Sequence, residues 1–182
     1  ILILYTRPPE IEPPPFSGVG TLGKEWFSSN DGDFRASAAA VEISPPGYVP
    51  VQAIMHELGH GLGLRHAGAQ NCPGGVGQEF NNTNNGTCAL TVYGDPDDTM
   101  GHGPQGTTSY SLAYRDYLRW LEPSHTWQVQ QNGVYQIEAR GAASTSLKQL
   151  KITLEGGGWY AIEYKDNKTG VDENDFGDEV SL

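Results

Sequence analysis

The stretch that most constrains the fold is His56-Glu57-Leu58-Gly59-His60-Gly61-Leu62-Gly63-Leu64-Arg65-His66. It contains three histidines and one glutamate, and we expect the main helix to end within it. Residues four apart lie on one face of an α-helix, so His56 and His60 can point at a single metal ion. Glu57 lies beside the first of them and can act as a general base toward water at the metal. A catalytic zinc site has three protein ligands and one open position, so a third ligand has to follow the helix.

Gly63 provides the route to that third ligand. Glycine accepts a positive φ and commonly ends a helix, so we expect the chain to turn sharply there. The turn brings His66 back toward the metal, whereas a straight helix would carry it out of reach along the axis. The spacing predicts a site with His56, His60 and His66 as metal ligands and Glu57 as the catalytic residue. An ordinary helix with unrelated histidines is disfavoured, because five residue types would have to coincide.

A methionine lies downstream, in the stretch Tyr93-Gly94-Asp95-Pro96-Asp97-Asp98-Thr99-Met100-Gly101. The pattern H-E-x-x-H-x-x-G-x-x-H followed by a methionine turn resembles the metzincin clan of metallopeptidases. Within that clan, the Tyr-Gly-Asp string and the closing Met-Gly look most like the gametolysin-type family of secreted enzymes. The resemblance covers residues 54–101 and is thinner over residues 110–123.

The resemblance implies a zinc-dependent endopeptidase with one catalytic ion. Its substrates would be extracellular, matrix or cell-wall proteins and glycoproteins. It also implies that Met100 supports the ligand histidines by packing and does not bind the metal. His102, two residues later, is a secondary candidate that can donate a hydrogen bond during the reaction, although a surface turn is the favoured interpretation. Three imidazoles also accept Cu²⁺, Co²⁺ or Ni²⁺, so the pattern leaves the identity of the metal open.

We expect an α+β fold with a metzincin-like catalytic domain over residues 1–122. That domain would contain a mixed twisted sheet, the active-site helix and the methionine turn. Residues 1–5 form a β-branched apolar run typical of a buried strand. A second strand is expected within 37–43, and the helix is expected to begin near Val49 or Pro50 and to end at about Leu62. Metzincins have more structure before this helix, so we expect the natural domain to begin upstream of this chain.

A small β-rich region is predicted over residues 123–182, and we expect it to be cut short. Residues 127–131 and 134–138 are predicted to form a hairpin with a type I′ turn at Asn132-Gly133. Residues 150–154 and 159–164 form a second alternating pair around a run of glycines.

Charge and composition limit the classes of partner that this chain can bind. The chain has 22 acidic residues against 11 lysines and arginines, a net charge of −11. Binding to nucleic acid needs clustered basic residues, so it is disfavoured. No apolar run approaches the length that spans a membrane. These observations are compatible with the protein or glycoprotein substrate that the resemblance implies; the sequence does not indicate an oligomeric state.

Several features favour an extracellular, secreted protein. Cys72 and Cys88 bracket one segment and are candidates for a disulfide in an oxidising compartment, with two free thiols as the alternative. Asn81, Asn85 and Asn167 begin sequons for N-glycosylation.

Acidic clusters raise the question of Ca²⁺. The tail at 172–179 and the group Asp95, Asp97 and Asp98 contain oxygen ligands, but the EF-hand spacing is not met. A solvated tail and an aspartate-organised turn are favoured instead.

Two other functions remain open. One is a weakly active or inactive metzincin-like module with a structural or interaction role in an extracellular glycoprotein, which Glu57 and the three histidines disfavour. The other is a metallopeptidase of another clan with a glutamate as third ligand, which His66 disfavours.

Overall fold

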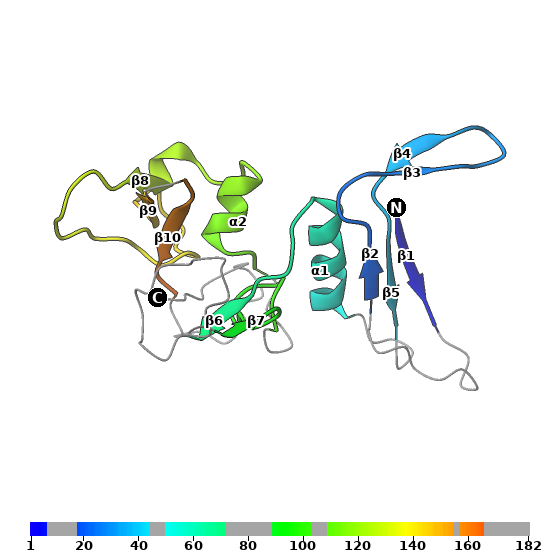
Figure 1. The fold of residues 1–182 in the computed structure, drawn as a ribbon, viewed down its shortest axis with the longest axis horizontal. Coiled ribbons are helices and arrows are strands. Elements are labelled where there is room, and N and C mark those ends of the chain that lie inside the picture. The colour runs from blue at the N-terminus through cyan, green and yellow to red at the C-terminus, as the bar shows by residue number, and fades with distance from the viewer. Residues whose placement is uncertain (7–17, 44–49, 72–88, 103–108, 155–156, 166–182) are drawn as a thin grey trace. The chain divides into compact units, whose positions relative to one another are not determined.

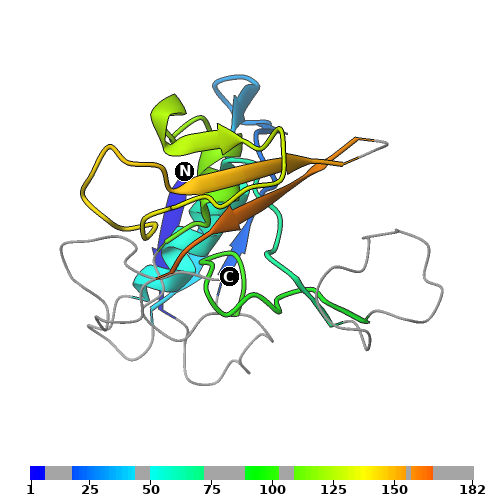
Figure 2. The same cartoon turned by 90° about the vertical axis from the view of Figure 1, so that its left-hand side faces the viewer.

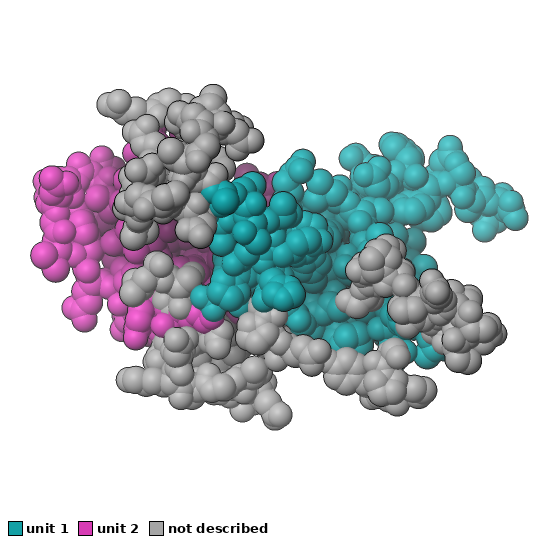
Figure 3. All heavy atoms as spheres, turned by 60° about the horizontal axis from the view of Figure 1, so that its bottom comes forward, with its two compact units in different colours: residues 1–105 teal, residues 106–182 magenta. Residues whose placement is uncertain are grey.

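The computed structural model describes residues 1–6, 18–43, 50–71, 89–102, 109–154 and 157–165. The chain divides into two compact units, residues 1–105 and 106–182, which are coloured separately in Figure 3. The expected mixed α+β class is confirmed, since the described residues form small sheets and two α-helices. The expected boundary between a catalytic domain over residues 1–122 and a β-rich region over residues 123–182 stays a prediction.

Unit 1 contains a three-stranded sheet beside the long helix (Figure 1). Its strands are β1 (Leu2–Tyr5), β2 (Gly18–Gly20) and β5 (Ala39–Glu42), in the order β1-β5-β2. The central strand β5 pairs in parallel with β1 and antiparallel with β2. Val41 in the middle of β5 is fully buried. This arrangement confirms the strand expected within 37–43 and makes β2 an edge strand of the described sheet.

The strand predicted at residues 1–5 is present, but the prediction that it is buried is wrong. The four apolar side chains from Ile1 to Leu4 are 41% to 59% exposed. Within the described residues β1 pairs only with β5, so it too is an edge strand. A short apolar run is compatible with an edge or a central position, and strand order alone decides between them.

The long helix α1 (Val51–Gly61) begins directly after Pro50 and packs on β2 and β5, which confirms the predicted helix. Two short hairpins complete unit 1. The first joins β3 (Glu25–Phe27) to β4 (Phe34–Ala36), and the second joins β6 (Ala69–Asn71) to β7 (Ala89–Thr91).

Unit 2 contains a second three-stranded sheet and a short helix. The helix α2 (Leu112–Tyr117) precedes a 3-10 turn at Pro123–His125. The sheet has the order β10-β9-β8, formed by β8 (Thr126–Gln128), β9 (Gln149–Thr153) and β10 (Trp159–Glu163). Figure 2 shows β9 and β10 running side by side. This antiparallel pair confirms the second predicted pair of strands.

None of the helices in the described part of the chain is long and apolar enough to cross a membrane.

The hairpin predicted over residues 127–138 is wrong. A type I′ turn needs positive φ at both central residues, and neither Asn132 nor Gly133 has one. Strand β8 instead pairs in parallel with β9, Trp127 opposite Leu150. The chain after β8 lines a pocket of about 410 Å³ together with Leu150, Ile152 and Ile162. Strand β8 thus takes a partner more than 20 residues away, a pairing that sequence alternation does not reveal.

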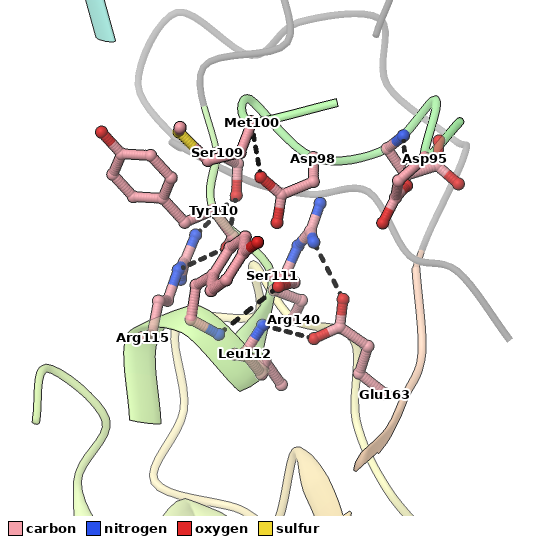
Figure 4. Close-up of polar contacts among 12 residues, drawn as sticks. Asp95, Asp98, Met100, Ser109, Tyr110, Ser111, Leu112, Arg115, Arg140 and Glu163 are labelled. Atoms are coloured by element: carbon pink, nitrogen blue, oxygen red, sulfur yellow. Dashed lines mark hydrogen bonds and ion pairs between the residues drawn. The ribbon is translucent and has the colours of Figure 1, made fainter. Parts of the chain in front are cut away.

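A buried ion pair joins Arg140 to Glu163 at the end of β10, and Glu163 also binds the start of α2 (Figure 4). One carboxylate oxygen of Glu163 accepts a hydrogen bond from Arg140 Nη1 at 2.9 Å. The other accepts from the backbone N–H of Leu112, at the first residue of α2. Both charged side chains are almost fully buried, so each depends on the other for compensation of its charge.

Replacing Glu163 by alanine should therefore destabilise unit 2. The substitution leaves Arg140 buried without this partner and removes the acceptor at the start of α2. We expect the free energy of unfolding to fall by about 3–5 kcal/mol, the cost of breaking a buried pair. Urea denaturation of the full chain measures it, with Glu122→Ala, at an exposed position, as the control. An unchanged midpoint for Glu163→Ala would contradict the assignment.

Candidate metal centre

The end of α1 is built on a glycine with left-handed backbone. Gly63 has φ +93°, which residues with a side chain rarely adopt. Its N–H donates to the carbonyl of His60 at 2.8 Å, and the N–H of Leu64 donates to the carbonyl of Gly59 at 3.0 Å. These two bonds form a Schellman motif, which ends a helix and reverses the chain. The buried side chain of Leu64 anchors the exit, and the predicted sharp turn at Gly63 is confirmed.

The reversal brings three histidines together. One ring nitrogen from each of His56, His60 and His66 lies within 4.8 Å of the other two. The Nε2 atoms of His60 and His66 are 3.1 Å apart. Ligand nitrogens 2.0–2.1 Å from a tetrahedral zinc ion would be about 3.4 Å apart. The cluster therefore has the donor type and the approximate spacing for one metal ion.

Backbone carbonyls orient two of the three rings. His56 Nδ1 donates to the carbonyl of Thr99, and His60 Nδ1 donates to the carbonyl of Leu64, both at 2.8 Å. A carbonyl can only accept, so the proton lies on Nδ1 in both rings. The lone pair is then on Nε2, the atom available to a metal. Hydrogen bonds of this kind fix the tautomer and orientation of ligand histidines in metal sites.

The segment around Met100 carries one of these carbonyls and is organised by aspartates. Asp95 Oδ1 accepts from the N–H of Asp97 at 2.8 Å, and Asp98 Oδ1 accepts from the N–H of Met100 at 2.7 Å, as Figure 4 shows for the second bond. The aspartate-organised turn favoured over calcium ligation is thus present. Met100 is fully buried, as expected for a packing residue.

This turn also connects to the chain beside His66. The carbonyl of Met100 accepts from the N–H of Ala67 at 2.9 Å. Together with the bond from His56 to Thr99, it links the turn both to the helix and to the segment carrying His66. The turn around Met100 therefore forms hydrogen bonds with His56 before Gly63 and with Ala67, next to His66, after it.

The electrostatics favour neutral imidazoles. Burial lowers the pKa of His56, as does the neighbouring His60, whereas the carbonyl of Thr99 and Asp98 act in the opposite direction. Burial likewise lowers the pKa of His66, with smaller contributions from His60 and His56. Neutral imidazole is the form that binds a metal. The lowered pKa values of His56 and His66 therefore favour metal binding at neutral pH.

Glu57 is 7% exposed and lies against the edge strand β2. A Cβ added at Gly18 would come within 2.8 Å of Glu57 Cγ, and one at Gly20 within 3.0 Å of Glu57 Oε2. Only glycines at these two positions leave room for this carboxylate. Burial raises the pKa of Glu57 to about 7, and a cation beside the carboxylate would favour its ionised form.

Tyr93 is the residue that sequence reasoning missed. Its ring centroid lies 3.8 Å from that of His66 and 6.0 Å from that of His56. The available signal was its place in the Tyr93-Gly94-Asp95 string, which supported the resemblance but suggested no contact. Ring contacts between distant segments leave no periodic trace in a sequence.

The remaining predicted residues are not brought into the cluster. His102 is exposed and is not a member of the histidine group found among the described residues, although its N–H donates to the carbonyl of Asp95 at 2.9 Å. Its secondary role stays a prediction. The other predicted features lie outside the described residues: Cys72, Cys88, Asn81, Asn85, Asn167 and the acidic tail at 172–179.

Comparison with known proteins identifies no relative. The chain matches no protein family, curated protein or solved structure. The residues and their geometry therefore carry the functional argument.

Replacing Gly63 by valine tests the turn. A β-branched residue at positive φ costs about 1–2 kcal/mol and pushes the chain toward a different path, which moves His66. We expect Zn²⁺ affinity to fall at least about tenfold, which corresponds to 1.4 kcal/mol. Competition with a chromogenic chelator measures this affinity.

Gly32 offers the matched control. It also has a positive φ, +116°, but lies in the turn between β3 and β4. Gly32→Val should therefore lose similar stability and keep its Zn²⁺ affinity. Equal losses of affinity in the two variants would show that strain, and not the position of His66, is responsible.

Proposed function

We propose that this chain is a zinc-dependent endopeptidase that hydrolyses peptide bonds of extracellular proteins or glycoproteins. The observation that carries the proposal is the convergence of three imidazoles, two from α1 and one from the segment after it, beside the buried carboxylate of Glu57. Three protein ligands leave a coordination position open, which distinguishes a catalytic site from a closed structural one. Zinc is the metal proposed, because such imidazole sets are common catalytic zinc ligands.

The chain's own residues have separate roles in this proposal. His56, His60 and His66 hold the ion. When bound, zinc supplies a water nucleophile of lowered pKa and polarises the carbonyl that is attacked. Glu57 accepts the proton of the attacking water and delivers it to the leaving amine as the C–N bond breaks. Burial raises the pKa of Glu57 to about 7 without a metal, and a cation at the histidines would favour the ionised form that accepts the proton.

The edge strand β2 supports a peptide as the substrate. Within the described residues β2 pairs only with β5, so its other edge presents backbone groups without a strand partner. Extended peptides bind such edges by adding a strand. A peptide bound there would lie next to Glu57, because Gly18 and Gly20 of β2 contact that side chain.

An extracellular location is part of the proposal. It rests on the candidate disulfide and the sequons, together with the strongly acidic composition. Expression in a eukaryotic secretory pathway followed by glycosidase treatment tests it. If the sequons carry glycans, the glycosidase should lower the apparent mass of the protein.

Glu57→Gln tests the catalytic assignment. Glutamine keeps the size of the side chain but cannot accept the proton, so turnover should fall about 10²- to 10⁴-fold, the usual contribution of a general base. Metal content should be unchanged, because Glu57 is not a ligand. The assay is chelator-sensitive hydrolysis of casein together with elemental analysis of the purified protein.

His60→Ala is the paired variant, and it should lose metal as well as activity. Wild-type, chelator-sensitive proteolysis by Glu57→Gln would overturn the catalytic role of Glu57. A wild-type protein that binds zinc but cleaves neither casein nor gelatin would instead favour an inactive module.

Gly18→Ala tests whether β2 positions the carboxylate. The added Cβ would meet Glu57 Cγ at 2.8 Å, so the side chain has to move. Misplacing a catalytic group by about 1 Å can cost on the order of 100-fold in rate. We expect kcat to fall 10- to 100-fold with full metal content.

Gly133→Ala is the control for this variant. Its Cβ would meet nothing closer than 3.5 Å, an ordinary contact. Turnover by Gly18→Ala equal to that of Gly133→Ala would mean that β2 does not position Glu57.

A further inference from the structure

His66 differs from the other two histidines in what holds its ring. His56 and His60 each donate an Nδ1–H to a backbone carbonyl. Among the described residues, the one hydrogen-bond contact of the His66 ring is that between its Nε2 and Nε2 of His60. His66 also follows the helix, so helical backbone does not fix its position. The third histidine therefore needs another means of orientation.

The ring of Tyr93 is placed to provide that means. The two ring centroids are 3.8 Å apart with an angle of 34° between the planes, the closest of the ring contacts in this cluster. A tilted ring packed against one face of an imidazole restricts its rotation and leaves the in-plane nitrogens accessible. The face of His66 is thus covered while Nε2 stays directed at His60.

The backbone around Tyr93 is itself held firmly. The N–H of Gly94 donates to the carbonyl of Thr91 at 3.0 Å, and the N–H of Asp95 donates to the carbonyl of Ala67 at 3.2 Å. A Cβ at Gly94 would come within 2.7 Å of Ala69 Cβ, so a residue with a side chain would not fit. Tyr93 is therefore fixed to the segment that immediately follows His66.

We propose that Tyr93 is a positioning residue for the metal centre, whose aromatic ring orients His66 for ligation. This inference rests on the metal site of the proposed function but not on its peptidase activity. Metal binding makes an imidazole more electropositive, and the face of a tyrosine ring attracts positive charge. The ring contact is therefore stronger in the metal-loaded state, which raises metal affinity. The role requires the ring and not the hydroxyl.

Tyr93→Ala and Tyr93→Phe separate these contributions. Loss of a residue that orients a ligand typically lowers metal affinity 10- to 100-fold. We expect Tyr93→Ala to lower Co²⁺ affinity about tenfold and to weaken the visible absorption of bound Co²⁺, which reports its coordination geometry. Tyr93→Phe should restore both to wild-type values. Tyr117→Ala, which removes an exposed tyrosine of α2 in unit 2, is the control and should bind Co²⁺ normally.

A double-mutant cycle identifies the histidine through which Tyr93 acts. In a His66→Ala background, adding Tyr93→Ala should cause no further loss of the residual Co²⁺ affinity, because the oriented ring is already gone. Circular dichroism and thermal unfolding verify that each variant is folded.

Two results would overturn the inference: wild-type Co²⁺ affinity and spectrum in folded Tyr93→Ala, or an equal loss in Tyr93→Phe. An additive loss in the His66→Ala background would also contradict it. Failure of the peptidase proposal is distinguishable, because it would appear as absent proteolysis by a wild-type protein that still binds Co²⁺.

Discussion

The left-handed backbone of Gly63 is the constraint on which the metal centre depends. Two histidines one helical turn apart can share an ion, but a continuing helix would carry a third away along its axis. The Schellman motif at Gly63 stops α1 and reverses the chain within three residues of His66. The cost is low because glycine has no Cβ to oppose a positive φ. One backbone conformation thus converts a sequential run into a cluster.

Local reversal alone does not orient the rings, and the turn around Met100 supplies part of the rest. Asp95 and Asp98 use their side chains to satisfy backbone N–H groups within the turn. The carbonyls of Thr99 and Met100 accept hydrogen bonds from His56 and Ala67. Close approach to Asp95 also requires the glycine at position 101, where a Cβ would overlap the carbonyl of Asp95. The acidic residues therefore build a scaffold for the histidines.

Sequence reasoning succeeded where chemistry is local and failed where it depends on distant segments. The helix, its end at Gly63, the histidine cluster and the β9–β10 pair all follow from spacing within a short window. Three features do not follow from local spacing: the exposed edge position of β1, the parallel pairing of β8 with β9, and the contact of Tyr93 with His66. Each depends on which distant segments pack together. Periodicity carries no information about which distant partner a segment meets.

By itself, the sequence determined which side chains can share one metal ion and where the chain must reverse, because helical geometry and the conformational freedom of glycine are properties of a few adjacent residues. Only the tertiary structure decided which ring nitrogens face one another, how Glu57 is buried against β2 and which aromatic ring covers His66. Those outcomes depend on carbonyls, glycines and a tyrosine contributed by other segments. Their positions are set by strand order and by the packing of the whole of unit 1.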